Sequence, residues 1–176
     1  MLVSVSSGNF TPQKRTKFLH HHQNNKPMAH AKNRVWIHGV FSVKHRRPLI
    51  NKNIRAEVYE MIRANIRRAG CHPEVVGGIA DHVHVLFLLN RDTTISKVFQ
   101  QMKGATSREI NHTKMTAEHF NWQVGYAAFS VSESKVPIVE RYIENQEAHH
   151  RNQDFQQEFR FLLEGHHLVF EAEDLD

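Results

Sequence analysis

Residues 81 to 89 read Asp-His-Val-His-Val-Leu-Phe-Leu-Leu, a β-branched and apolar run that contains two histidines. Such a run predicts a buried strand. Because side chains alternate between the two faces of a strand, His82 and His84 share one face and Val83 and Val85 share the other. Two imidazoles on one face suit a metal ion. The alternative is that one histidine caps the strand while the other is hydrogen-bonded in a polar pocket.

Further strands and helices are predicted on both sides of this run. Strands are expected over residues 35–44, 71–76 and 125–131, with a turn at Gly77-Gly78. Helices are expected over residues 54–66, from Thr93 or Thr94 onward, over 136–146 and over 154–163. The order strand, helix, strand, strand, helix, strand predicts an α+β fold of the ferredoxin-like split βαβ type. We expect an antiparallel sheet with helices on one face, an open second face for a ligand, and an extra C-terminal helix that carries a tyrosine.

The length of 176 residues suits one globular domain with a substantial core. Residues 1–33 are polar and lack an apolar period, so we expect a disordered extension, with Met28 as a candidate start of the protein. The domain is expected over 34–165 and an acidic tail over 166–176. A single cysteine, Cys71, excludes an intramolecular disulfide and cysteine-based zinc motifs.

Charge is distributed unevenly along the chain, whose net formal charge is +5. Residues 34–132 contain 14 Lys and Arg against 7 Asp and Glu, whereas residues 133–176 contain 4 against 11. A cationic body of this kind suits a polyanion such as nucleic acid, although ordinary solvated surface is the alternative. No segment reaches the roughly 18 consecutive apolar residues of a membrane span. We therefore expect a cytoplasmic protein that is not bound to a membrane.

Tyr142 and Gln146 are four residues apart on a predicted helix, and therefore lie on one helical face. The alternative is that Tyr142 packs in the core and Gln146 is a solvated polar residue. Val139 and Ile143, however, already supply an apolar stripe for this helix. Tyr142 is also the strongest candidate nucleophile among the three tyrosines, since the other two fall in a packing helix and in a strand.

These residue types together suit phosphodiester chemistry. Two neutral imidazoles and an amide carbonyl can hold a divalent cation, Mg²⁺ or Mn²⁺, with positions left open for phosphate oxygens. The cation acts as a Lewis acid on the scissile phosphate. A tyrosine hydroxyl can then attack phosphorus, form a phosphotyrosine and release a 3′-hydroxyl. The reverse attack by another 3′-hydroxyl rejoins strands without ATP.

Four segments resemble the single-tyrosine HUH transposases of the insertion-sequence 200/605 family. They are Asp81 to Leu86, Arg141 to Gln146, Val40 to Pro48, and Met102 to Gly104. The resemblance covers roughly residues 34 to 160. It implies a homodimeric DNA transposase that cuts and rejoins single-stranded DNA at hairpin-marked ends through a 5′-phosphotyrosine.

The resemblance also implies roles for individual residues. Tyr142 would be the nucleophile, and His82, His84 and Gln146 would be metal ligands. In such dimers the tyrosine helix can serve the histidine pair of the partner. The cationic candidates for DNA binding are Lys44, Arg46, Arg47, Lys97, Lys103 and Arg108. We expect no small-molecule cofactor besides the divalent cation.

Other interpretations remain open at this point. A non-catalytic single-stranded RNA- or DNA-binding module can have the same sheet topology, with bases stacked on aromatic side chains. A domesticated relative that processes chromosomal hairpin repeats would use the same chemistry without moving itself. A metal-dependent nuclease that uses water would leave no covalent adduct. His149 and His150 could add a ligand or a proton shuttle, or be exposed helix residues.

Overall fold

The computed structural model describes residues 32–151 and 154–171. The predicted N-terminal extension over residues 1–33 therefore lies almost entirely outside the described residues. The end of the predicted acidic tail, residues 172–176, lies outside them as well. Among the described residues, no helix has both the length and the apolar character needed to cross a membrane.

Four strands form one antiparallel sheet. They are β1 (Trp36–Ser42), β2 (His72–Gly78), β3 (His82–Leu88) and β4 (Ala127–Val131). Their order across the sheet is β2-β3-β1-β4, so β1 and β3 lie in the middle. All three pairs of neighbouring strands are antiparallel. The predicted α+β class and ferredoxin-like strand order are confirmed.

Helices connect and follow these strands. They are η1 (Lys44–Arg46), α1 (Lys52–Arg68), α2 (Ile95–His112), η2 (Glu133–Lys135), α3 (Val136–Glu144), α4 (Gln146–His149) and α5 (Phe155–Glu164). Three of them begin at side-chain caps: Asn51 starts α1, Thr94 starts α2 and Asp154 starts α5. Each of these side chains accepts a hydrogen bond from a backbone N–H of the first turn, which has no partner within the helix.

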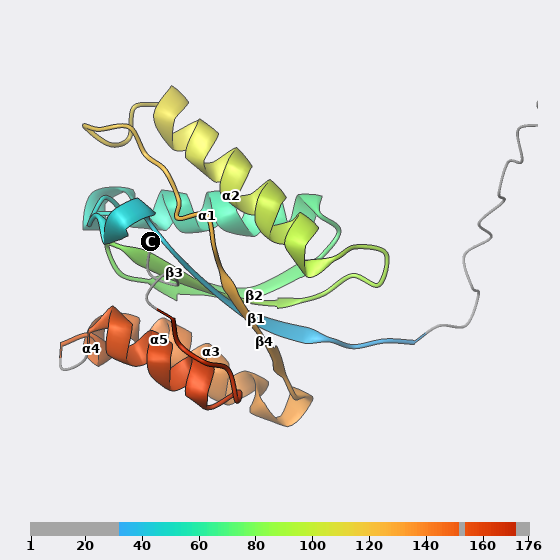
Figure 1. Ribbon diagram of the computed structural model, residues 1–176. Coiled ribbons are helices and arrows are strands. Elements are labelled where there is room, and N and C mark those ends of the chain that lie inside the picture. Colours follow the sequence, from blue (N-terminus) through green and yellow to red (C-terminus); the bar gives the residue numbers. More distant parts are fainter. Residues whose placement is uncertain (1–31, 152–153, 172–176) are drawn as a thin grey trace, which may run out of the picture. The chain divides into compact units, whose positions relative to one another are not determined.

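Helices α1 and α2 cover one face of the sheet (Figure 1). The side chains of β3 that point to this face, Val83, Val85 and Phe87, pack in one buried cluster with Ile62 of α1 and Met102 of α2. This is the helical layer that the sequence predicts.

The second face carries the C-terminal helices α3 and α5 (Figure 1). The expectation that this face is open to a ligand is wrong. Its apolar side chains, such as Val40 and Phe129, are covered by Phe155, Phe159 and Leu163 of α5. Burial of each such phenylalanine contributes on the order of 1.5–3 kcal/mol, so a sheet with apolar residues on both faces needs two helical layers.

Two predicted boundaries differ from the structure. Gly77-Gly78 is not the hairpin turn but the end of β2, and the turn lies at residues 79–81. A Cβ atom at Gly77 would lie 2.4 Å from the carbonyl oxygen of Ile143, so glycine here lets α3 approach the sheet. The predicted helix over residues 136–146 is interrupted at Asn145, where α3 ends and α4 follows.

Candidate active site

His82 and His84 of β3 are completely buried and point to the face that α3 and α5 cover. Their ring centroids lie 5.1 Å apart. Val83 and Val85 lie in the core on the opposite face. The two imidazoles therefore share one face, as the alternation of side chains along a strand predicts.

One ring nitrogen of each histidine is held by a neighbouring side chain. The Nδ1 atom of His82 lies 2.8 Å from Oδ1 of Asp81, and the Nδ1 atom of His84 lies 3.1 Å from Nε2 of His38. Such contacts fix ring orientation and leave both Nε2 atoms for the site. His82 Nε2 lies 3.3 Å from Oε1 of Gln146. His84 Nε2 is buried and has no hydrogen-bond partner within residues 32–151 and 154–171.

The side chains of Tyr142, on α3, and Gln146, at the start of α4, both point toward the histidine pair. The hydroxyl of Tyr142 and the amide Nε2 of Gln146 both donate to Oε1 of Glu158, the latter at 2.8 Å. The Tyr142 ring meets the His84 ring edge-on, with centroids 5.7 Å apart. The structure therefore brings together the four residues that the sequence proposes as nucleophile and ligands, although their roles stay predictions.

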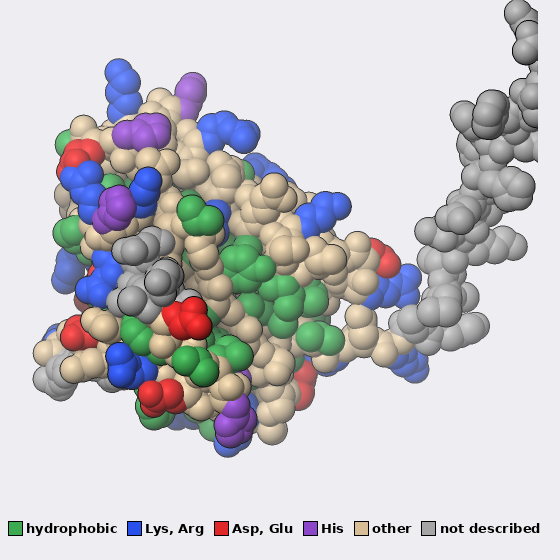
Figure 2. Space-filling model, in the orientation of Figure 1, with side chains coloured by type: hydrophobic (Ala, Val, Ile, Leu, Met, Phe, Trp, Pro, Cys, Tyr) green, Lys and Arg blue, Asp and Glu red, His purple; other side chains and the backbone are tan. Residues whose placement is uncertain are grey.

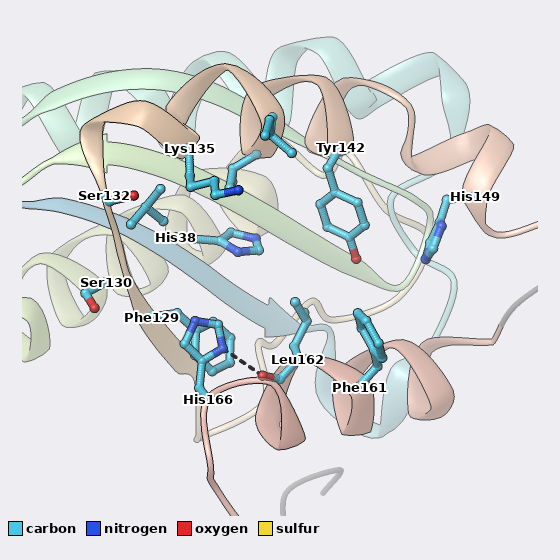
Figure 3. Close-up of a pocket in the computed structure, with 13 residues that line it drawn as sticks. His38, Phe129, Ser130, Ser132, Lys135, Tyr142, His149, Phe161, Leu162 and His166 are labelled. Atoms are coloured by element: carbon cyan, nitrogen blue, oxygen red, sulfur yellow. Dashed lines mark hydrogen bonds between the residues drawn. The ribbon is translucent and has the colours of Figure 1, made fainter.

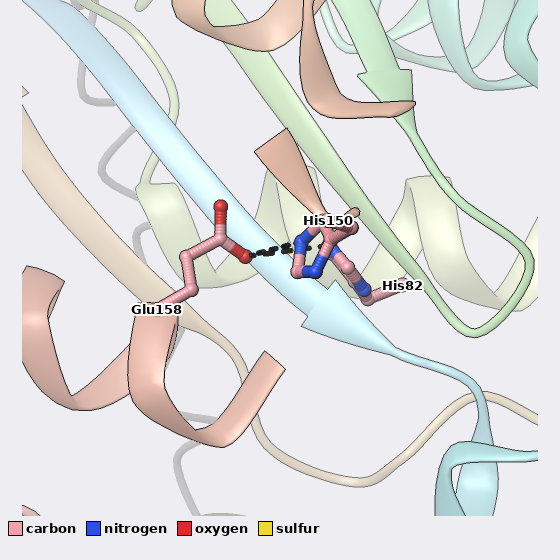
Figure 4. Close-up of side chains that lie close together, drawn as sticks. All are labelled: His82, His150 and Glu158. Carbon is pink, nitrogen blue, oxygen red and sulfur yellow. Dashed lines mark hydrogen bonds and ion pairs between the residues drawn. The ribbon is translucent and has the colours of Figure 1, made fainter. Parts of the chain in front are cut away.

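Glu158 of α5 lies at the centre of this group, and the sequence analysis missed it. Its side chain is only 1% exposed. Its Oε2 atom lies 2.9 Å from Nε2 of His150 and 3.4 Å from Nε2 of His82 (Figure 4). A signal was present in the sequence, because Glu158 falls three residues after Phe155 and one before Phe159, inside the apolar stripe of its helix.

His38 is the second residue that the sequence analysis missed. It lies on β1, is 4% exposed and contacts His84 from the neighbouring strand. Its signal is weaker, since a single histidine in an apolar strand is compatible with many environments. Only the pairing of β1 with β3 brings the two rings together.

Burial and charge shift the protonation equilibria of the site. Burial, together with the negative charge of Glu158, raises the pKa of Tyr142 far above its ordinary value. Burial disfavours an ionised Glu158, but interactions with His150, His82 and His84 outweigh it and hold the pKa of Glu158 well below its usual range. Burial lowers the pKa of His84 to about 4, so this ring is neutral near pH 7. A neutral imidazole is the form that binds metal ions.

A cavity of about 780 Å³ opens beside Tyr142, between α3, α5 and β4 (Figure 3). Apolar and aromatic side chains form much of its lining, including Phe129, Phe161 and Leu162. His38 lies at its inner wall and the tyrosine hydroxyl points toward α5 (Figure 3). The space therefore offers aromatic surface next to the candidate nucleophile.

The cationic segment after β1 lies near the histidine pair. Lys44 is exposed on η1, and Arg47 forms an ion pair with Glu118. The Nε atom of Arg46 lies 3.9 Å from Oδ2 of Asp81, the residue that holds His82. A phosphate near the histidines would therefore meet positive charge from this segment.

The three predicted DNA-binding residues of α2 differ in their environment. Lys97 and Arg108 are exposed. Lys103 is half-buried and donates to the carbonyl oxygens of Val124 and Gly125, at 3.0 and 2.6 Å. Burial lowers the pKa of Lys103 to about 8. On the face that Figure 2 draws, patches of hydrophobic side chains lie among Lys and Arg, Asp and Glu, and His side chains.

Comparison with known protein families identifies a match over most of the described domain. The model of the family described as "Transposase IS200 like" matches residues 31–146, which are 116 of the 176 residues. The match includes the histidine pair, Tyr142 and Gln146, and ends before α5. No curated protein sequence matches the chain significantly.

Nine chains of solved structures match this chain, and two of them illustrate the shared fold. One is a crystal structure of a protein described as a candidate transposase from Deinococcus radiodurans, with a TM-score of 0.53 and 20% identity. It covers 66% of this chain and 93% of that chain. The other is a REP-associated tyrosine transposase bound to a REP hairpin, with a TM-score of 0.53 and 12% identity, over 69% and 73% of the two chains. At these identities the likeness supports the fold alone.

Proposed function

Because the chain belongs to the IS200-like transposase family, we propose that it cuts and rejoins single-stranded DNA at hairpin-marked ends, with Tyr142 as nucleophile. The observation that carries this proposal is the meeting of Tyr142, Gln146, His82 and His84 at one buried place. Three separate segments supply these side chains, and a packing role for each would not require them to converge.

The residues present suit a divalent cation, Mg²⁺ or Mn²⁺. The Nε2 of His84, the Nε2 of His82 and the Oε1 of Gln146 are the proposed ligand atoms. When bound, the cation supplies Lewis-acid polarisation of the scissile phosphate and orients it. Neutral imidazole and amide oxygen ligands leave the positive charge of the ion available to phosphate oxygens.

The covalent step takes place on Tyr142. Its oxygen attacks phosphorus, a Tyr142–phosphorus bond forms, and the bond from phosphorus to the 3′ oxygen of the preceding nucleotide breaks. The phenolic proton passes through solvent to the departing oxygen, so a free 3′-hydroxyl and a 5′-phosphotyrosine result. The reverse reaction with another 3′-hydroxyl restores a phosphodiester and the tyrosine. No external energy source is needed, since one phosphoester bond replaces another.

Single-stranded DNA that forms hairpins is the proposed substrate. A structural relative with the same fold is bound to a REP hairpin. In this chain, the exposed Lys44 and Arg47 lie on the segment next to the histidine pair, where they can contact phosphates. The cavity beside Tyr142 offers the exposed Phe161 as a surface on which an unpaired base can stack.

Two copies of the chain are proposed to act together. One tyrosine makes one cut, and excision of a segment requires cuts at both ends. Within this chain, Tyr142 lies against its own His84, with ring centroids 5.7 Å apart. A homodimer in this arrangement has two complete sites, one for each end.

The proposal is tested with hairpin-forming strands taken from DNA that flanks the gene. The full chain is incubated with each strand and Mn²⁺ or Mg²⁺, and denaturing gels report protein that carries DNA. We expect an adduct with the natural chain and none with Tyr142→Phe. The matched control is Tyr59→Phe on α1. It removes a buried hydroxyl that has no hydrogen-bond partner in the part of the chain that the structure describes. Hairpin binding without any adduct would instead support a non-catalytic binding module.

A further inference from the structure

Glu158 is in an unusual environment for a glutamate. Glutamate is almost never fully buried unless it is paired, and this side chain is 1% exposed. The ion pairs of Glu158 within residues 32–151 and 154–171 are formed with histidines. Histidine, unlike lysine or arginine, is positively charged only when it is protonated. These ion pairs therefore supply no permanent positive charge to the carboxylate.

Three imidazole nitrogens surround one oxygen of this carboxylate. The Oε2 atom lies 2.9 Å from Nε2 of His150, 3.4 Å from Nε2 of His82 and 3.4 Å from Nε2 of His84. Ligands of one metal ion, at 2.0–2.2 Å from it, lie about 3 to 4.4 Å from one another. The candidate ligand atoms of His82, His150 and Glu158 all lie within 4.8 Å of one another (Figure 4).

A second observation points to a ligand that binds between these side chains. His84 is completely buried, and its Nε2 atom has no hydrogen-bond partner among the described residues, although Oε2 of Glu158 lies 3.4 Å from it. A buried polar atom without a partner costs about 1–3 kcal/mol. The opposite ring nitrogens of His84 and His82 are held by His38 and Asp81. This is the outer-shell pattern that orients metal-binding histidines.

The ligand atoms of Glu158 and His150 lie close enough to that of His82 to hold one ion, and we propose that both residues are ligands of the divalent cation in this site. They add one imidazole and one carboxylate to the ligands proposed above, and both lie beyond residue 146, where the family match ends. The inference rests on the proposed function in placing a cation at the histidine pair, but metal binding can be measured without DNA.

The donor set predicts which ion the site prefers. Mg²⁺ prefers oxygen ligands and gives up its water reluctantly, so a site with several imidazole nitrogens is unfavourable for it. Imidazole suits divalent transition metals, of which Mn²⁺ is the weakest binder in the usual order of affinity. Because Mn²⁺ is the weakest binder among these metals, tighter binding of Mn²⁺ than of Mg²⁺ is the most stringent evidence that several imidazole nitrogens bind the ion.

Calorimetric titration of the full chain with Mn²⁺ and with Mg²⁺, in the absence of DNA, tests the proposal. We expect Mn²⁺ to bind at least tenfold more tightly than Mg²⁺. Glu158→Gln keeps the size of the side chain and removes its charge, and should weaken Mn²⁺ binding at least tenfold. The matched control is Glu164→Gln, an exposed glutamate on the same helix, which should bind Mn²⁺ like the natural chain.

Unchanged Mn²⁺ affinity in Glu158→Gln would overturn the assignment of Glu158, and equal affinity for Mn²⁺ and Mg²⁺ would overturn binding by several imidazole nitrogens. If Glu158→Gln fails to fold, pulsed electron paramagnetic resonance of Mn²⁺ on the natural chain decides. Coupling to imidazole nitrogens that diminishes in His150→Ala supports the proposal, and coupling that stays the same contradicts it. Failure of DNA cleavage with intact Mn²⁺ binding would count against the proposed function and leave this metal site standing.

Discussion

The hydroxyl of Tyr142 donates a hydrogen bond to Oε1 of Glu158, which joins the helix of the proposed nucleophile to the last helix of the chain. The matched family segment ends at residue 146, but the candidate site continues into α5. Burial and the carboxylate together raise the pKa of the phenol. The hydroxyl is therefore protonated at neutral pH and must lose its proton when it attacks phosphorus.

Gly77 lets α3 lie close to the sheet, and Gly77→Ala should move the helix that carries Tyr142. The added Cβ would lie 2.4 Å from the backbone oxygen of Ile143, which cannot rotate away. Overpacking of this kind destabilises by about 1–3 kcal/mol. We expect a lower free energy of unfolding in urea and slower adduct formation.

Gly104→Ala is the matched control for this change. Apart from its chain neighbours and the backbone of α2 itself, no atom of the described residues lies within 4 Å of the position that its Cβ would occupy. Alanine in a helix is roughly 0.5–1 kcal/mol more favourable than glycine, so this variant should be stabilised. Equal stability of the two variants would show that α3 does not press on the sheet at Gly77.

His38 makes the metal-free protein sensitive to acid. Burial and the neighbouring His84 lower the pKa of His38 from 6.5 to about 3. The unfolded chain therefore binds a proton below pH 6.5 that the folded chain excludes, and stability falls as pH decreases from 6.5 toward 3. In buffer that contains a chelator, acidification from pH 7 to pH 5 should lower the unfolding free energy of both proteins. The decrease should be about 2 kcal/mol smaller in His38→Phe than in the natural chain.

Urea unfolding at the two pH values measures this difference. The control is His72→Phe, because His72 has a side chain that is 71% exposed. This variant should lose as much stability on acidification as the natural chain. If His38→Phe shows the same loss as well, then His38 titrates normally in the folded protein and its burial has no effect on acid stability.

Lys44 and Lys103 should affect DNA binding differently. Lys44 is exposed on the segment near the histidine pair, whereas Lys103 donates to the carbonyl oxygens of Val124 and Gly125. Loss of a phosphate contact reduces the slope of log affinity against log salt by about 1. Lys44→Ala should show this reduction in hairpin binding measured by fluorescence anisotropy at several salt concentrations.

Lys103→Ala should instead lower thermal stability and leave the salt slope unchanged. The reason is that its ammonium group is hydrogen-bonded to the loop before β4. A reduced slope in Lys103→Ala, with a normal slope in Lys44→Ala, would reverse the assignment of these two lysines.

Asp81 orients His82 and should influence metal affinity without contacting the ion. Its Oδ1 atom lies 2.8 Å from Nδ1 of His82. Loss of such an outer-shell partner typically weakens metal binding by 10–100-fold. Asp81→Asn should therefore weaken Mn²⁺ binding by about tenfold or more. The exposed Asp92→Asn is the control, and an affinity for Mn²⁺ equal in both variants would mean that Asp81 does not position the ring.

Local sequence patterns predict much of the fold and part of the site. Strand alternation places His82 and His84 on one face, and helical spacing places Tyr142 near Gln146. The position of Glu158 depends on how α5 packs against the second face of the sheet, which no local pattern specifies. The apolar stripe of α5 does contain Glu158. A pattern of apolar residues, however, does not indicate which polar side chains will contact the Glu158 carboxylate.

The hairpin turn shows the same limit. A Gly-Gly pair usually indicates a turn, yet Gly77 is required because α3, more than 60 positions later in the sequence, passes over β2. Contacts between distant segments therefore decide both where the strand ends and where the site is completed.

The most direct test of the central claim is to identify the residue and the DNA end that are joined in the adduct. Hairpin strands labelled at either end are incubated with the full chain and Mn²⁺, and the adduct is digested and sequenced by mass spectrometry. We predict a 5′-phosphate ester on Tyr142 that carries the fragment with the labelled 3′ end. An adduct on another residue, or cleavage that leaves a free 5′-phosphate without any adduct, would contradict the account.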